Sequence, residues 1–109
     1  MLARVPEELI DLPEELVPYR RAYDEAAAAV AAYVERLEAE YRERYPDPGG
    51  VWHEDQARLR NAWTEDESAE LQRLREARES ARQALWDQPA HEAGQANGDW
   101  KRWKPLDRD

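Results

Sequence analysis

The run from Pro18 to Tyr45, which contains no Gly or Pro after its first residue, constrains the fold more than any other feature. Pro18 suits the first turn of a helix, where the N–H that proline lacks would have no partner. The segment 46–50 holds two prolines and two glycines and stops a helix sharply. The pattern predicts a single helix over 18–45, roughly 42 Å long at about 1.5 Å per residue. Apolar residues at steps of three and four form its stripe: Tyr19, Tyr23, Ala26, Val30, Tyr33, Val34, Leu37, Tyr41 and Tyr45.

A second helical pattern begins at Glu54. The apolar residues beyond Glu67 fall on one face of a helix. The earlier apolar residues do not fall on that same face if the helix is continued backwards. The tetrapeptide Thr64-Glu65-Asp66-Glu67 between them has the form of a capping box, which marks a helix start. We therefore favour two helices, about 54–62 and 65–87, with a bend near Thr64. A continuous helix with a drift in phase is the alternative.

The segment 46–53 is rich in turn-forming residues and lies between the two helical patterns. It is expected to form the loop of an elongated antiparallel helical hairpin. We expect an all-α fold with three parts, namely an arm at 1–17, a hairpin domain at 18–88 and a tail at 89–109.

The arm and the tail interrupt helical periodicity. The arm repeats Pro-Glu-Glu-Leu at 6–9 and 13–16, and each proline can open a short helical turn. The tail contains Pro89, Gly94 and the turn signal Asn97-Gly98, so it is expected to be mostly irregular.

The hairpin has a thin predicted core, because large aliphatic residues are few and Phe is absent. A two-helix hairpin alone buries little apolar surface, so we expect it to pair with a second copy into a four-helix homodimer. The tyrosines of the long stripe are expected at the edge of the core. A ligand groove lined by these tyrosines is the alternative.

The chain of 109 residues carries a formal net charge of −9, and the acidic excess is spread along it. Such a balance disfavours nucleic acid and anionic membranes as partners over most of the surface. No cysteine is present, and no apolar run approaches the length of a membrane span. A soluble cytoplasmic protein is the simplest interpretation.

The residue patterns of common catalytic and metal sites are missing. The two histidines, His53 and His91, belong to neither a Glu-x-x-His nor a His-Glu-x-x-His pattern. The sequence also contains no nucleophile elbow and no phosphate-binding glycine loop. We therefore expect a protein that is not an enzyme and has no catalytic residue, no cofactor and no metal. A weak metal clip at His53-Glu54-Asp55 is the alternative.

Two apolar sets are candidates for binding a partner protein. Trp100 and Trp103 lie among three basic residues in the tail, and Leu9, Ile10 and Leu12 lie in the arm. Inserting aromatic side chains into a groove of a partner is a common way to bind it. Folding back onto the chain's own hairpin and stacking on nucleic-acid bases are the alternatives for the tail.

The favoured function is a small protein–protein interaction or assembly module that self-associates through its hairpin. Trp63-Thr64-Glu65-Asp66-Glu67, with Leu71 downstream, resembles the opening of a Myb/SANT-type helix. This resemblance implies a DNA-associated regulator as an alternative, although the later tryptophans and basic recognition helix of that family are missing. A third hypothesis is an acidic mimic or inhibitor of a nucleic-acid-binding protein.

Overall fold

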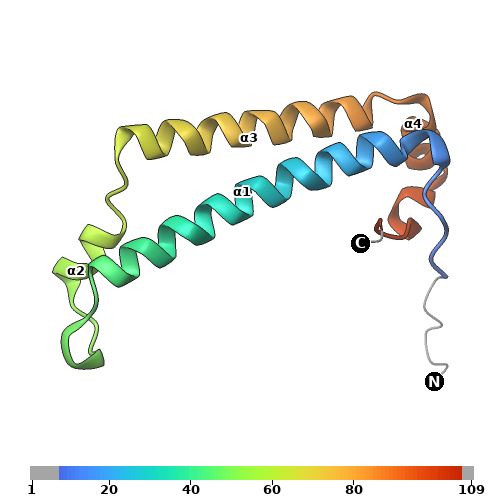
Figure 1. The fold of residues 1–109 in the computed structure, drawn as a ribbon. Coiled ribbons are helices and arrows are strands. Elements are labelled where there is room, and N and C mark those ends of the chain that lie inside the picture. The colour runs from blue at the N-terminus through green and yellow to red at the C-terminus, as the bar shows by residue number, and fades with distance from the viewer. Residues whose placement is uncertain (1–7, 107–109) are drawn as a thin grey trace, which may run out of the picture. The chain divides into compact units, whose positions relative to one another are not determined.

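The structure of the protein is a computed structural model that describes residues 8–106. The fold is all-α, and the helix α1 (Val17–Arg44) packs against α3 (Glu65–Trp86) as a hairpin (Figure 1). The predicted all-α helical hairpin is therefore confirmed. The long helix begins one residue before the range 18–45 predicted for it and ends one residue before the end of that range.

The connection between the two long helices contains a short 3-10 helix, Pro48–Gly50, and the helix α2 (Glu54–Arg60). The bend predicted in the second arm is confirmed, because residues 61–64 separate α2 from α3. A capping box starts α3. The Thr64 hydroxyl accepts the Glu67 N–H at 3.1 Å, and the Glu67 carboxylate accepts the Thr64 N–H at 2.9 Å.

The tail differs from the irregular segment expected at 89–109. It forms the helix α4 (Pro89–Asn97) and then a 3-10 helix, Asp99–Arg102. Pro89 occupies the first turn of α4, where proline favours a helix instead of breaking it. Gly98 ends α4 in the left-handed conformation with φ of 81°, which is the usual role of a glycine just beyond a helix.

In the arm, a 3-10 helix at Glu14–Leu16 agrees with the short turns expected there. The first Pro-Glu-Glu-Leu copy begins at residue 6, so it lies partly outside the described residues.

The contacts group the described chain into two compact units. Unit 1 comprises residues 8–24 and 79–106, and unit 2 comprises Glu25–Arg78. The buried apolar side chains are few in each unit. They are Leu16 and Leu85 in unit 1, and Val30, Leu37, Tyr41 and Leu71 in unit 2.

In unit 2, the carboxylate that caps α3 also binds α1. The Tyr41 hydroxyl donates to Glu67 Oε1, and the Tyr33 hydroxyl donates to the Glu67 carbonyl at 3.3 Å. The bond from Tyr41 is the first cause that lowers the pKa of Glu67, followed by the bond from the Thr64 N–H. The same hydrogen bond raises the pKa of Tyr41. The start of α3 is thus fixed against α1.

In unit 1, the arm and the tail lie side by side. Ile10 and Trp103 form an isolated parallel β-bridge, in which the Ile10 N–H donates to the Arg102 carbonyl at 2.8 Å. The Lys104 N–H donates to the Ile10 carbonyl, also at 2.8 Å. These bonds hold residue 10 to a segment more than ninety positions away, and Arg102 Nε adds a bond to the Glu8 carbonyl at 3.0 Å.

Gly94 lets the Trp103 ring approach the backbone of α4. A Cβ atom at position 94 would overlap Cζ2 and Cη2 of that ring. Replacing a helical glycine by alanine normally favours the helix by about 0.5–1 kcal/mol. Here we expect Gly94→Ala to destabilise the protein by about 1–3 kcal/mol, because the ring has to move. Urea unfolding measures this change.

A second variant separates crowding from other effects of the substitution. Gly94→Ala combined with Trp103→Leu should recover part of the lost stability, since the smaller side chain leaves room for the new methyl group. A Gly94→Ala protein at least as stable as the original would show that Trp103 does not pack on Gly94.

Candidate functional site

The tip loop, residues 46–53, turns the chain at the end of α1 in unit 2. Gly49 and Gly50 adopt positive φ angles of 66° and 72°, which glycine tolerates without steric cost. The Gly50 N–H donates to the Asp47 carbonyl at 3.1 Å, and the Val51 N–H donates to the Pro48 carbonyl at 3.4 Å. The Pro-Asp-Pro-Gly-Gly sequence therefore forms a local turn, as its composition predicts.

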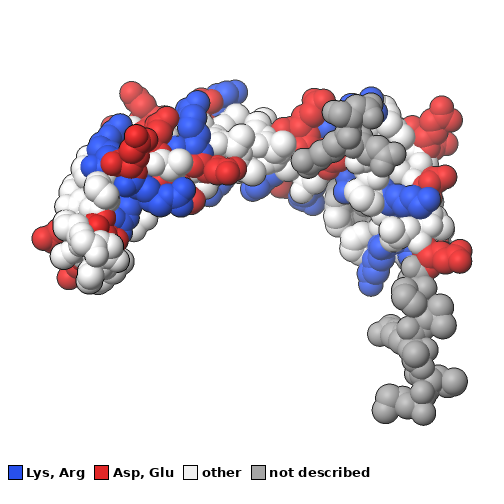
Figure 2. Space-filling model, turned by 60° about the horizontal axis from the view of Figure 1, so that its bottom comes forward, with Lys and Arg blue, Asp and Glu red and all other residues white. Residues whose placement is uncertain are grey.

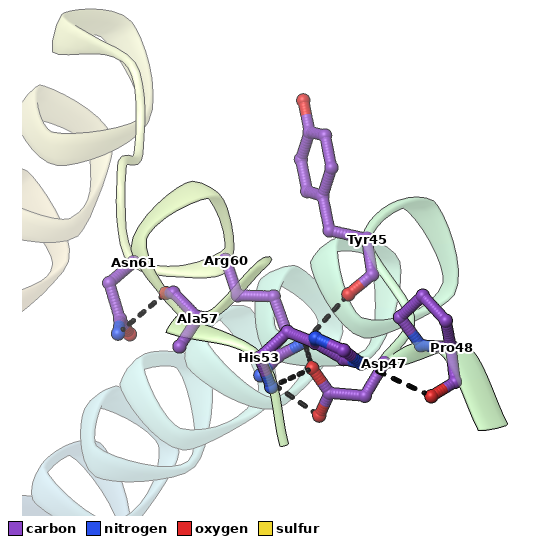
Figure 3. A network of polar contacts seen from close by, with 7 residues as sticks. All are labelled: Tyr45, Asp47, Pro48, His53, Ala57, Arg60 and Asn61. Carbon is purple, nitrogen blue, oxygen red and sulfur yellow. Dashed lines mark hydrogen bonds and ion pairs between the residues drawn. The ribbon is translucent and has the colours of Figure 1, made fainter. Parts of the chain in front are cut away.

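An ion pair between Asp47 and Arg60 braces this loop against α2 (Figure 3). Arg60 Nη1 and Nη2 donate to the two Asp47 carboxylate oxygens at 3.2 and 3.3 Å. Arg60 Nη1 also donates to the Tyr45 carbonyl, near the end of α1, at 2.7 Å. This two-pronged geometry fixes orientation as well as distance, because the guanidinium and the carboxylate are both planar.

His53 completes the brace on the far side of the loop. Its N–H donates to Asp47 Oδ1 at 3.0 Å, and its Nε2 lies 3.3 Å from the Pro48 carbonyl oxygen (Figure 3). In the described part of the chain, no group of three or more His, Cys, Asp or Glu residues could hold a metal ion. The two contacts of His53 hold the loop in place.

The pKa of Asp47 reports the balance of forces in the brace. Partial desolvation acts to raise this pKa, but the His53 N–H and the hydrogen bond and charge of Arg60 together lower it below its ordinary value. The stability that ionised Asp47 gives to the folded chain is fully present above the ordinary aspartate pKa of about 3.9. It is lost as the pH falls through the lower pKa of the folded chain.

The braced loop carries two large apolar side chains into solvent. Val51 is 64 % exposed and Trp52 is 65 % exposed. On the neighbouring α2, the exposed Leu59 lines a shallow surface pocket with Asp55, Arg58 and Ala62. Tryptophan is enriched in the binding hot spots of protein interfaces, and a rigid backbone lowers the entropy lost on binding. We call Val51, Trp52 and Leu59 the tip surface.

Sequence reasoning located the loop but missed these residues. The available signal was a tryptophan directly after dense turn chemistry, outside both helical stripes. The pairing of Asp47 with Arg60 left no such signal, because the two residues are 13 positions apart.

The sequence-predicted binding residues of the arm have different environments. Leu9 is 55 % exposed, whereas Ile10 is half-buried in its bridge to Trp103. Leu12 is half-buried and lines a surface pocket with Lys104 and neighbouring apolar residues. In the structure, Ile10 and Leu12 therefore lie beside the tail, whereas the side chain of Leu9 is exposed to solvent.

The two tail tryptophans also differ. Trp103 is half-buried and packs on α4, while Trp100 remains at the surface of unit 1 with its ring 6.1 Å from that of Trp86. The tail thus folds back onto its own unit, one of the alternatives expected for it. A role of Trp100, Trp103, Leu9, Ile10 or Leu12 in binding a partner stays a prediction.

Several arginines of α2 and α3 pair with glutamates one turn away. Arg58 with Glu54, Arg73 with Glu70 and Arg82 with Glu79 form ion pairs at 3.1, 2.6 and 2.5 Å. On the face drawn in Figure 2, basic and acidic side chains are interspersed. This pattern is typical of a solvated, salt-paired surface and does not favour phosphate binding by these arginines.

No protein-family model, curated protein or solved structure matches this chain. The candidate site is therefore argued from its own geometry. Within residues 8–106, none of the helices has the length and apolar character needed to cross a membrane.

The brace generates a prediction for hydrogen exchange. In Arg60→Gln, the carboxylate of Asp47 loses its charged partner, so the loop should open more often. We expect the His53 amide to exchange about 2- to 10-fold faster, the range that the loss of one hydrogen bond implies. Exchange followed by NMR measures this rate.

Arg58→Gln is the matched control, because Arg58 lies on the same helix but pairs only with the exposed Glu54. That variant should leave the exchange of His53 unchanged. Equal acceleration in both variants would mean that loss of charge on α2, and not the brace, controls the loop.

Proposed function

We propose that this protein is a non-enzymatic protein–protein interaction or assembly module that self-associates through its helical hairpin. The observation that carries the proposal is the tip surface, where a braced loop holds Trp52 largely in solvent. A soluble chain gains nothing for its own stability from such an exposed indole. Association with another protein would bury the indole and recover its hydrophobic free energy.

The brace supports the role of the tip surface in binding. Tyr45, Asp47 and His53 fix the backbone on both sides of the exposed pair, so little loop freedom remains to be lost on association. Pre-organisation of this kind increases affinity without any additional contact. If the loop were only a flexible linker, it would need no defined conformation and would gain nothing from such a brace.

Self-association is supported by the small core of unit 2. The four buried apolar side chains come from one layer made by α1 and α3. Four alanines of α1 are exposed and provide a face with small side chains, which allows a second helix to approach closely: Ala28, Ala29, Ala31 and Ala32. A second copy would thicken a core that is thin for a stable domain.

The absence of recognisable catalytic patterns in the sequence supports the non-enzymatic part of the proposal. The exposed apolar residues favour protein over nucleic acid as the partner, and the net charge of −9 adds to this preference.

Self-association predicts a molar mass twice the 12.8 kDa of one chain. Light scattering coupled to size-exclusion chromatography at several concentrations measures this mass. Replacing Ala28 and Ala32 by Glu should shift the protein to monomers, because like charges would then face the second copy. A monomer mass for the unmodified chain at every concentration would contradict self-association.

The tip surface predicts which substitutions disrupt binding of a different protein. The full-length chain, immobilised and exposed to extract of its native cell, should retain a specific protein at near-equal amount. Trp52→Ala and Val51→Ser should lose it, since they remove the exposed apolar contact.

Leu9→Ala and Trp100→Ala are the comparison, because they alter the exposed residues of unit 1. Retention of the partner by these variants would assign binding to the tip surface. Loss of the partner only in these variants would move the contact to the arm and tail. Nucleic acid as the main retained species would contradict the proposal.

A further inference from the structure

Unit 1 contains a pocket of about 190 Å³ that the interaction function does not use. Pockets for drug-sized ligands usually measure at least about 300 Å³, so this pocket suits a molecule with one or two rings. Eight side chains from α1, α3, α4 and the tail line it, namely those of Arg20, Tyr23, Arg82, Leu85, Trp86, His91, Trp100 and Trp103.

Aromatic rings form most of the pocket wall. Trp86 and His91 stack with ring centroids 4.9 Å apart and an angle of 29° between their planes. The Trp103 ring meets His91 edge-on at 5.3 Å, and Trp100 lies at an angle to Trp86. The parts of these rings that line the pocket give it an apolar, aromatic wall, which suits contact with a planar aromatic guest.

His91 presents an unused hydrogen-bond donor. Its side chain is 4 % exposed, and the Gln95 amide nitrogen lies 2.8 Å from its Nδ1. An amide nitrogen can only donate, so Nδ1 accepts and the proton of the neutral ring is on Nε2. Nε2 has no hydrogen-bond partner among the described residues, and no described side-chain nitrogen or oxygen is both fully buried and unpaired. His91 lines the pocket, so Nε2 is the ring nitrogen left to donate to a guest.

The neutral state of His91 follows from its surroundings. Burial lowers the pKa of His91, and the positive charge of Arg20 lowers it further. The ring is thus an uncharged donor at neutral pH, with Arg20 supplying a positive charge nearby.

Arg20 supplies further unused donors. Its Nε donates to Asp24 at 3.1 Å, while Nη1 and Nη2 have no acceptor among the described residues. Asp24 does not line the pocket, and neither does any other carboxylate of residues 8–106. Tryptophan and tyrosine add N–H and O–H groups that can donate, whereas Arg82 Nε and Nη2 already donate to Glu79. The lining that the described residues provide therefore contains several donors and no anionic acceptor.

We infer that this pocket binds a small planar aromatic carboxylate, with the ring against the aromatic side chains of the wall and the carboxylate on Arg20 and His91. An anion provides the acceptors that the lining lacks, and a guanidinium binds a carboxylate through parallel hydrogen bonds. A cationic guest suits the aromatic walls, but the charge of Arg20 opposes it. This inference is independent of the proposed interaction function, because it uses only residues of unit 1.

Calorimetric titration of the full-length chain with benzoate and with indole-3-carboxylate tests the inference. We expect saturable binding of one molecule per chain for at least one acid. The matching amides, benzamide and indole-3-carboxamide, have nearly the same shape but no charge, so they should bind at least about tenfold more weakly. No saturable binding of either acid, or equal binding of acid and amide, would overturn the proposal.

Arg20→Gln should weaken binding of the acid at least about tenfold, because it removes the charged donors. Arg21→Gln is the matched control, since it removes the same charge from the next position of α1, where the side chain is exposed and does not line the pocket. An equal loss of affinity in both variants would show that net charge, and not the pocket, attracts the acid.

A measurement on the unmodified chain covers the case in which Arg20→Gln fails to fold. In NMR spectra, the acid should shift the indole N–H signals of Trp86, Trp100 and Trp103. The signals of Trp52 and Trp63, which lie in unit 2, should stay in place. Shifts spread evenly over all five tryptophans would contradict binding in the pocket.

Discussion

The carboxylate of Glu67 performs two functions that are usually separate. It caps the first turn of α3 by accepting the Thr64 N–H, and it accepts the Tyr41 hydroxyl from α1. A capping interaction normally acts within one helix. Here the same carboxylate also fixes where α3 starts relative to α1, so local helix chemistry and hairpin packing depend on one side chain. In a unit with four buried apolar side chains, this polar contact adds a directional link between the two helices.

The features that could be predicted from the sequence are those that depend on near neighbours. The stripe of α1 repeats every three or four residues, and the capping box spans four, so both are visible in a short window. The tail shows the limit of this reasoning. Pro89 follows the end of α3 and is the first residue of α4. From the sequence alone, a proline at this position can mark either a break in helical structure or the start of a new helix. Gly94, which weakens a helix by itself, is tolerated because Trp103 occupies the space beside it.

The candidate sites were less predictable because they depend on pairs of residues far apart in the chain. Arg60 lies on one helix among other arginines, and nothing local distinguishes it from Arg58 as the partner of Asp47. The pocket of unit 1 joins residues that are still farther apart in the chain, because its walls come from residues 20–23 and 82–103. The tail tryptophans were predicted as binding residues from their type, but their arrangement with His91 required the three-dimensional structure.

The contact between Ile10 and Trp103 has a consequence for how the protein is made. Residue 10 leaves the ribosome long before residue 104, and the β-bridge needs both segments. Unit 2 is a continuous stretch, Glu25–Arg78, and its contacts become available while synthesis is still under way. Unit 1 cannot close until residue 104 has been made, and closing it joins segments more than ninety positions apart. During that interval Ile10 and Leu12 lack the tail segment beside which they are half-buried, so these apolar side chains are open to aggregation.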